Sequence, residues 1–294
     1  MGYNQNTIPE SVIAEVFEGL KSEEMSLAEQ IGYATRVMDI AGTLPVSASI
    51  TSLAGIPLGG IQEGAMAPEN IDGFGSVDYR CLRHIGSDVL LDGIVRSLEA
   101  FGYDSLAASA RSCRAQAAAS IDALLNARLI DAALNETTAA ALPYTNPGST
   151  PIQDMFAAQR LCGRGDLAVI GGDVAEALST HPDFLSQTAY FDAGGVGMGT
   201  IVQQMRGLSP SLQTVVVGST MFRASNPGQA LQLNYQFDGT LWFGHSRSLV
   251  FVDAGSVSEM GREVRREASI LRHTHRADII RTHVEMGCTV TGVI

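Results

Sequence analysis

Apolar residues recur at helical spacing near the start of the chain and predict an amphipathic arm ahead of the main body. Pro9 suits the first turn of a helix. One helical face then collects Val12, Ile13, Val16, Phe17 and Leu20. A weaker run continues this spacing through Leu27, Ile31, Ala34 and Met38. A segment with one apolar face must dock on something, either its own domain or a neighbouring subunit.

Residues 42–76 change to strand periodicity and predict a long two-stranded excursion with a flexible tip. Alternate positions hold Val46, Ala48 and Ile50, and after the glycine-rich stretch GIPLGGIQEG they hold Val77, Tyr79 and Cys81. The segment contains no lysine or arginine. Because a two-stranded ribbon is marginally stable alone in water, we expect this one to lie against another chain. A local lid or an ordinary hairpin is the alternative.

The following apolar positions predict a helix over 88–101 and a much longer helix over 104–135. The longer one carries a single apolar stripe of Leu106, Ala110, Cys113, Ala117, Ile121 and Leu124. Alanine, the strongest helix former, is frequent throughout it. At the rise of an α-helix this element would measure roughly 48 Å. A helix longer than a small domain is wide would act as a strut.

A compact α/β region is predicted from Thr150 onward. The pattern gives a helix to about Leu161, a buried strand at Leu167–Ile170, and a second helix from about Asp173 to His181. Short apolar or alternating runs predict further strands at 214–218, 231–237, 241–244 and 248–253.

The end of the chain predicts a charged ribbon. Arginines from Arg262 to Arg281 are interleaved with acidic residues. Even positions from Ile280 to Ile294 are then mostly apolar, a sustained period of two. This pattern places Arg281, His283 and Glu285 together on the opposite face.

Composition narrows the classes of function. A net charge of −12 argues against a nucleic-acid reader, which needs a basic face. The low charged fraction of 17% suits either a surface hidden against neighbours or a large α/β core. Lys21 is the only lysine; arginine favours planar pairing across interfaces, although a codon bias would give the same ratio.

Four scattered cysteines without CxxC spacing predict small buried hydrophobes in a reducing cytoplasm. No apolar run approaches the ~20 residues of a membrane span, so we expect no membrane partner.

Candidate chemical groups do not converge on a site. His273 and His275 share one side of a predicted strand and His283 follows, so three imidazoles would be available to zinc. Neighbouring arginines disfavour a cation there, and we expect ordinary, partly exposed histidines. The run GGVGMGT at 194–200 lacks the lysine of a phosphate loop and predicts a surface loop.

Three other matches are equally weak. The tripeptide RGD at 164–166 predicts a turn between a helix and a strand. The stretch GHSRS around Ser246 misses the nucleophile-elbow pattern at its last position. Nothing in the sequence brings Cys162 and His181 together as a nucleophile and base. We therefore predict no catalytic, cofactor-binding or metal site.

The order of the elements resembles the major capsid protein of tailed phages, the Hong Kong 97-like fold. The stretch IQEGAMAPENIDGFGSVDYRCLRHIGSDVLLD resembles the return strand of that family's extended loop, running into the helix before its spine helix. LAVIGGDVAEALSTHPDF and LWFGHSRSLVFVDAGSV resemble parts of its axial domain. REASILRHTHRADIIRTHVEMGCTVTGVI resembles its closing peripheral strands. The resemblance covers nearly the whole chain and lies in order and spacing, not in an invariant signature.

This resemblance implies an α+β fold with five segments. They are an N-terminal arm (1–41), an extended loop (42–84), a peripheral domain with a long spine helix (85–135), an axial domain (136–254) and returning peripheral-domain strands (255–294).

The resemblance also implies a role without catalysis or cofactor. The chain would assemble with itself into pentamers and hexamers of an icosahedral shell, enclosing phage double-stranded DNA without reading its sequence. Portal and possible scaffolding or decoration proteins would be its other partners. It would be made in the host cytoplasm and reside in the virion capsid.

Contacts between subunits would come from two segments. The extended loop would supply Val46, Ile50, Leu53, Ile56, Leu58, Ile61 and Glu63. The arm would supply Val12, Val16, Phe17 and Leu20.

Two features depart from some family members. The loop lacks the lysine with which some relatives cross-link their subunits. The short segment before the loop leads us to expect no cleaved scaffolding region. The alternatives are an encapsulin-like nanocompartment shell with a protein cargo and, from another class, a metal-dependent enzyme that uses the C-terminal histidines.

Overall fold

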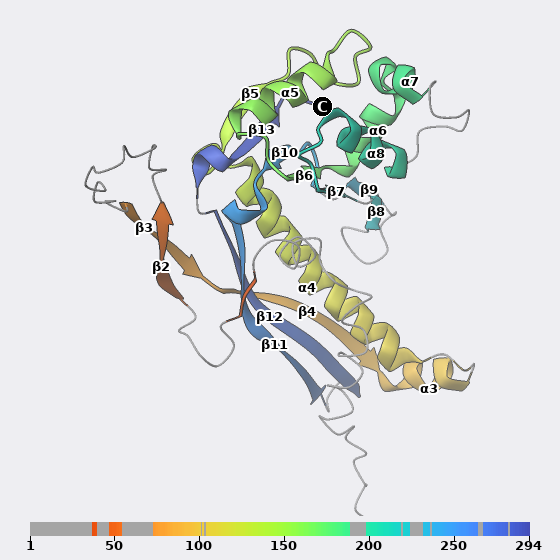
Figure 1. Ribbon diagram of the computed structural model, residues 1–294. Helices are drawn as coiled ribbons and strands as arrows, with labels where there is room; N and C mark the ends of the chain where they lie inside the picture. The colour runs from red at the N-terminus through yellow and green to blue at the C-terminus, as the bar shows by residue number, and fades with distance from the viewer. Residues whose placement is uncertain are drawn as a thin grey trace, which may run out of the picture.

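Two β-sheets joined by one long helix make up the body of the molecule (Figure 1). The computed structural model describes residues 37–39, 47–54, 73–100, 102, 104–188, 198–218, 220–223, 232–235, 237–263, 267–281 and 283–294. The long helix, α4 (Ser105–Ile130), crosses one face of the first sheet and ends beneath the second.

The first sheet has four strands in the order β1-β11-β12-β4. Their bounds are β1 (Val37–Asp39), β11 (Leu249–Glu263), β12 (Ala268–Arg281) and β4 (Leu82–Leu91). The three long strands are antiparallel, whereas β1 runs parallel to β11 at Phe251–Asp253. We refer to this sheet and α4 as the peripheral part of the molecule.

The second sheet has five strands in the order β5-β13-β10-β6-β7. Their bounds are β5 (Glu136–Ala139), β13 (Gly287–Thr291), β10 (Leu241–Gly244), β6 (Leu167–Ile170) and β7 (Thr214–Val217). Three helices pack on one face, α5 (Pro151–Leu161), α6 (Gly172–Thr180) and α8 (Met198–Leu208), with α7 (Pro182–Thr188) beside them.

Shorter elements complete the description. They are α3 (Asp92–Ala100), the 3₁₀ turns η1 (Ser246–Ser248) and η3 (Val284–Met286), and the pair β8 (Thr220–Arg223) and β9 (Gln232–Tyr235).

The predicted two-stranded excursion is present as β2 (Ser47–Ala54) and β3 (Gly73–Arg80). The strands pair antiparallel from Ser47↔Arg80 to Ala54↔Gly73. The ribbon stands away from both sheets on one side of the molecule (Figure 1). Its tip, residues 55–72, lies outside the described residues.

Helix α4 packs on the first sheet at unusually short range because β4 carries a glycine beneath it. A Cβ atom at Gly86 would lie only 1.7 Å from the carbonyl oxygen of Cys113 on α4. No other residue could occupy this position without moving the helix. The Asp104 side chain accepts a hydrogen bond from Ala107 N and caps the start of α4.

Both predicted helix boundaries in this region are wrong. Residues 88–91 belong to β4, which pairs with β12 as far as Leu91↔Ala268, and helix α3 begins only at Asp92. Helix α4 ends at Ile130, so it has 26 residues and measures roughly 39 Å. Asp131 adopts an extended conformation, and the stripe is completed by Leu125 and Leu129, while Leu124 is only half-buried.

The predicted continuous C-terminal strand is also wrong. The alternation of apolar residues continues past Arg281, but the strand does not. Strand β12 ends at Arg281, and the 3₁₀ turn η3 comes before the next strand. Strand β13 then joins the second sheet between β10 and β5. Conversely, β11 continues the predicted strand 248–253 as far as Glu263 in the first sheet.

Smaller predictions fared unevenly. The helix at Pro151–Leu161 and the strand at Leu167–Ile170 are confirmed. Helices α7 and α8 were not anticipated, and α8 begins at Met198 inside the stretch predicted as a surface loop. Phe237 lies in a turn with a φ of 56° instead of in a strand. Met38 belongs to strand β1, so the weaker helical run does not extend to it.

Candidate assembly surfaces

The two sheets meet at a buried joint built around the only tryptophan. Trp242 on β10 is fully buried, and its Nε1 donates a hydrogen bond of 2.8 Å to Oδ1 of Asn135. The Asn135 amide nitrogen donates in turn to the carbonyls of Arg128, Leu129 and Asp131, at 2.8, 3.0 and 3.1 Å. One side chain therefore closes the end of α4 and ties it to the second sheet.

A buried cation completes the joint from the other side. The Arg281 guanidinium, at the end of β12, lies 5.2 Å from the centre of the Trp242 ring. It donates hydrogen bonds to Ser248 Oγ and, at 3.0 Å, to the carbonyl of His283. Burial lowers the pKa of Arg281 to about 10, against the opposite influence of Cys162 and Glu285. The guanidinium still carries its charge at neutral pH.

Two glycines make room for this stack. Gly244 and Gly287 face each other across β10 and β13. A Cβ at Gly244 would lie 2.3 Å from the Trp242 ring, and one at Gly287 would lie 2.2 Å from an Arg281 nitrogen. A methyl group at either position would displace the stack.

The apolar core runs through the joint without a gap. One cluster combines the end of α4, the second sheet and the first sheet: Ile121, Leu125, Leu129, Leu167, Val169, Phe237, Trp242, Leu249, Phe251, Ala277 and Ile279. Interiors packed at this density do not deform continuously. The first sheet, α4 and the second sheet therefore form one stiff body.

The β2–β3 ribbon is anchored to that body at its base. Tyr79 and Cys81 pack with Val250, Val252 and Ile280 on the face of the first sheet opposite α4. The backbone nitrogen of Arg80 donates to the buried carboxylate of Asp278 at 2.8 Å.

Two further contacts bear on this anchor. The other carboxylate oxygen of Asp278 lies 3.6 Å from the Arg128 guanidinium of α4, so the ribbon base is linked to the spine. Burial, with Asp278 and Asp253 nearby, raises the pKa of the Cys81 thiol to about 11. This cysteine therefore acts as an apolar packing group, and all four cysteines are buried as predicted.

The C-terminal histidines have structural partners. His273 and His275 are buried, so the expectation of partly exposed side chains is wrong. Their rings lie 3.0 Å from Ser258 Oγ and from Asp253 Oδ1, respectively. His283 is half-buried and lies just beyond the end of β12. Within the described part of the chain, no group of three His, Cys, Asp or Glu side chains is arranged to hold a metal ion.

Other candidate groups are also engaged in holding turns. The Asp166 carboxylate of the RGD tripeptide accepts hydrogen bonds from the backbone and hydroxyl of Ser246, at 2.6 and 2.7 Å. Burial raises the pKa of Asp166, but the hydrogen bonds from Ser246 outweigh it, so the pKa lies below its ordinary value. His181 lies 3.0 Å from Ser149 Oγ, and burial raises the pKa of the Cys162 thiol. Neither Ser246 with Asp166 nor Cys162 with His181 forms an activated nucleophile.

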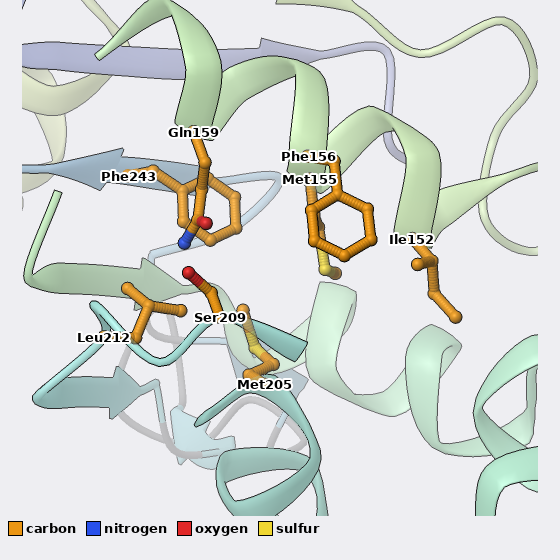
Figure 2. A pocket seen from close by; sticks show the side chains of 8 residues that line it. All are labelled: Ile152, Met155, Phe156, Gln159, Met205, Ser209, Leu212 and Phe243. Atoms are coloured by element: carbon orange, nitrogen blue, oxygen red, sulfur yellow. The ribbon is translucent and has the colours of Figure 1, made fainter. Parts of the chain in front are cut away.

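The helical face of the second sheet carries a seam between α5 and α8. Figure 2 shows Met155 on α5 above Met205, with Phe243 and Leu212 at the same seam. The space enclosed is about 10 Å³, no more than one water molecule needs.

A wider pocket of about 340 Å³ adjoins the seam and shares Phe156, Gln159 and Ser209 with it. The rest of its lining is Arg160, Arg164, Pro210 and Ser211. Among the described residues, this lining contains no carboxylate, histidine or cysteine, and so no acid–base or nucleophile–base pair.

The predicted subunit contacts are only partly visible. Ile50 and Leu53 lie on β2. Val46, Ile56, Leu58, Ile61 and Glu63, and the arm residues Val12, Val16, Phe17 and Leu20, lie outside the described residues. Sequence reasoning did not find the joint. It also missed the exposed aliphatic side chains on β4 and β11; of these, Val89 and Leu91 fell within the helix predicted over 88–101.

Comparison with known proteins rests on structure alone. No family model and no curated protein matches the sequence. Among the described residues, no helix is long and apolar enough to cross a membrane.

Several solved structures match along almost the whole chain. A phage-related protein from Bordetella bronchiseptica RB50 has a TM-score of 0.65 at 11% identity, covering 98% of this chain and 99% of that one. A virus-like particle from Pyrococcus furiosus has a TM-score of 0.57 at 10% identity, covering 97% and 100%. The mature capsid of bacteriophage PhiM1 has a TM-score of 0.50 at 13% identity, covering 99% and 88%. The chain has the fold of phage capsid subunits, and the predicted Hong Kong 97-like architecture is confirmed.

Proposed function

We propose that this chain is the major capsid subunit of a tailed phage, assembling into a closed icosahedral shell around double-stranded DNA. The observation that carries the proposal is the projecting β2–β3 ribbon on a stiff body whose fold matches shell subunits over nearly its whole length. Its role is structural and needs no catalysis.

The ribbon supports assembly because its described anchoring to the body lies at its base. Tyr79 and Cys81 are buried against the first sheet, whereas the paired strands extend beyond it. A two-stranded ribbon needs a third partner to be stable. A neighbouring subunit supplies that partner, and Val46, Ile50, Leu53, Ile56, Leu58, Ile61 and Glu63 make the contact.

The arm makes the second contact through Val12, Val16, Phe17 and Leu20. Ribbon and arm contacts join different surfaces of successive copies, and such heterologous contacts build a closed shell when their rotation closes into rings. Pentamers and hexamers are the rings, and portal, scaffolding or decoration proteins are the additional partners.

Packaged DNA is held by enclosure. The net charge of −12 disfavours tight binding to phosphates, so the genome can leave the shell. Synthesis takes place in the host cytoplasm, and the mature protein resides in the virion.

The second candidate is an encapsulin-like shell around a protein cargo. The match to the virus-like particle from Pyrococcus furiosus, which covers 100% of that chain, favours it. Particles purified from cells distinguish the two functions: the capsid proposal expects nuclease-protected DNA after packaging, and the alternative expects a stoichiometric protein cargo.

The test of shell formation combines negative-stain microscopy with sedimentation velocity. We expect closed particles or capsomer-sized rings from the wild-type protein. Replacing residues 55–72 by a two-residue turn keeps the Ala54↔Gly73 pair and removes the tip. This variant should fold, with unchanged Trp242 emission, and fail to form shells. Normal shells from this variant would contradict the role of the ribbon, and monomers from every preparation would contradict the function.

A further inference from the structure

Among the described residues, nothing covers one face of the first sheet where β4, β12 and the second half of β11 pair. Helix α4 packs on the face that contains His84, Gly86, Leu271 and His273. On the opposite face, Ile85, Val89 and Val257 have exposed fractions of 48, 47 and 59%. Contiguous exposed aliphatic groups of this kind mark interaction surfaces.

Strand register makes these residues neighbours. Ile85 lies opposite Thr274, which lies opposite Val257, so they form one row across β4, β12 and β11. Val89 lies opposite Ile270 in the next row but one along the strands. We call this surface, with the charged residues next described, the open face.

The open face is also basic. Arg83 lies directly opposite Arg276, and Arg272 lies opposite Glu259. Like charges facing each other across strands destabilise a sheet by about 0.2–1 kcal/mol. An acidic partner would relieve this repulsion.

One segment of the chain matches both properties. Residues 8–31, ahead of β1, predict a helix whose apolar face contains Val12, Val16, Phe17 and Leu20. They carry six glutamates and one lysine, against three arginines and two glutamates, Glu259 and Glu263, on the open face. An amphipathic acidic helix complements an apolar basic surface in both respects.

The polarity of β1 indicates which copy supplies the helix. Because β1 runs parallel to β11, with Val37 at Phe251 and Asp39 at Asp253, the chain before Val37 leaves toward Leu249. The open face lies in the other direction, beyond Ser256. At Val37 the chain therefore enters β1 from the end of β11 that is remote from the open face, which favours a second copy as the source of the helix.

We propose that the open face is the docking site for the amphipathic arm, residues 8–31, of a second copy of this chain. This inference rests on the proposed function, since it names the surface that receives the arm in the shell. The aliphatic rows contact the apolar side of the arm, and the arginines pair with its glutamates.

The only lysine offers a direct assay. Lys21 lies at the end of the predicted apolar stripe, so endoproteinase Lys-C cuts the chain at one place. Docking slows this cut. In assembled particles, Ile85→Asn with Val89→Asn should raise the cleavage rate at least tenfold. The control pair Leu142→Asn with Leu161→Asn changes exposed aliphatic positions just after β5 and at the end of α5, and should leave the rate unchanged.

Milder variants and salt keep the test decisive. If the Asn pair does not assemble, Ile85→Ala with Val89→Ala should still raise the rate about threefold. Arg276→Glu should raise it as well, and wild-type particles should be cut faster at higher salt. Particles that form normally and are cut at the wild-type rate in all these variants would overturn the docking site while leaving the shell function intact.

Cross-linking identifies the copy. Because the native cysteines are buried, Val16→Cys subunits and Val89→Cys subunits can be mixed, assembled and treated with a short bismaleimide. A product of twice the subunit mass supports docking between copies. Two results would contradict it: a cross-link that forms only when both cysteines are in one chain, and no cross-link at all.

Discussion

The Asn135 side chain offers the sharpest test of the joint between the two sheets. Asn135→Ala removes the acceptor of Trp242 Nε1 and three hydrogen bonds to the end of α4. The carbonyls of Leu129 and Asp131 each keep a second donor, so only that of Arg128 depends on Asn135 among the described residues. A buried indole N–H without an acceptor costs about 1–3 kcal/mol, and the lost helix contacts cost about 1 kcal/mol more. We expect a loss of about 2–4 kcal/mol in the free energy of unfolding.

A double-mutant cycle separates the hydrogen bond from the other effects. Trp242→Phe also removes the bond and leaves a void, at a cost of about 2–3 kcal/mol. Once either partner is absent, losing the other costs less. The double variant should therefore be about 1–2 kcal/mol more stable than the sum of the single effects predicts.

Urea unfolding of unassembled subunits measures these differences. Far-UV circular dichroism is the signal, because Trp242→Phe removes the only tryptophan. Asn126→Ala is the matched control: Asn126 lies on α4, whose end Asn135 closes, and it accepts its hydrogen bond from Thr240 Oγ1 instead. It should show no coupling to Trp242→Phe. A coupling energy below about 0.3 kcal/mol between Asn135 and Trp242 would refute the reasoning.

Three further predictions concern the peripheral sheet and the spine. Gly86→Ala should destabilise the subunit by about 3 kcal/mol or more, because the new Cβ collides with the backbone of α4. Gly93→Ala has open space around it and should stabilise α3 by about 0.5–1 kcal/mol. Thermal melts compare the two variants. Ile121→Asp should prevent folding, since it buries an unpaired charge, and soluble yield measures this. Burial lowers the pKa of His84 from 6.5, so the stability that the neutral ring contributes above pH 6.5 is lost as the pH falls toward the lower pKa of the folded state. His84→Gln should therefore weaken the pH dependence of the urea midpoint between about pH 7 and pH 5.

Periodicity predicted the elements that have strong local signals. The helix Pro151–Leu161 begins with a proline that suits its first turn, and the strand Leu167–Ile170 is a short apolar run. The extended ribbon was predicted because alternation flanks a glycine-rich reversal on both sides. In these cases local preference and tertiary packing agree.

Tertiary contacts decided the elements that were missed. Residues 88–91 fit a helix or a strand equally well, and only pairing with β12 selects the strand. The helix predicted to stop at about His181 does so, but the sequence did not show that Pro182 begins a new helix, α7. The three residues of β1 are too few to show a strand period, and the helical run was extended to Met38, so the parallel pairing with β11 was not predicted.

The candidate surfaces divide along the same line. The ribbon and arm contacts were predicted from patterns within short segments. The joint was not, because Trp242 and Asn135 are 107 positions apart and neither residue type announces the other. The open face was not predicted either, because each of its rows combines residues of β4, β12 and β11, and β4 is far from the other two strands along the chain.

A subunit with the proposed role has to meet its neighbours in more than one environment, and two kinds of structure would divide this requirement. The joint of Trp242, Arg281 and two glycines packs too tightly to bend, so angular adjustment cannot come from the middle of the subunit. It must come from segments that are tied to the body at one end. The ribbon is fixed at Tyr79 and Cys81, and the arm is fixed where β1 pairs with β11. If this is correct, variants that loosen the joint should yield malformed shells even when ribbon and arm are intact, whereas shortening the ribbon should abolish shells without disturbing the joint.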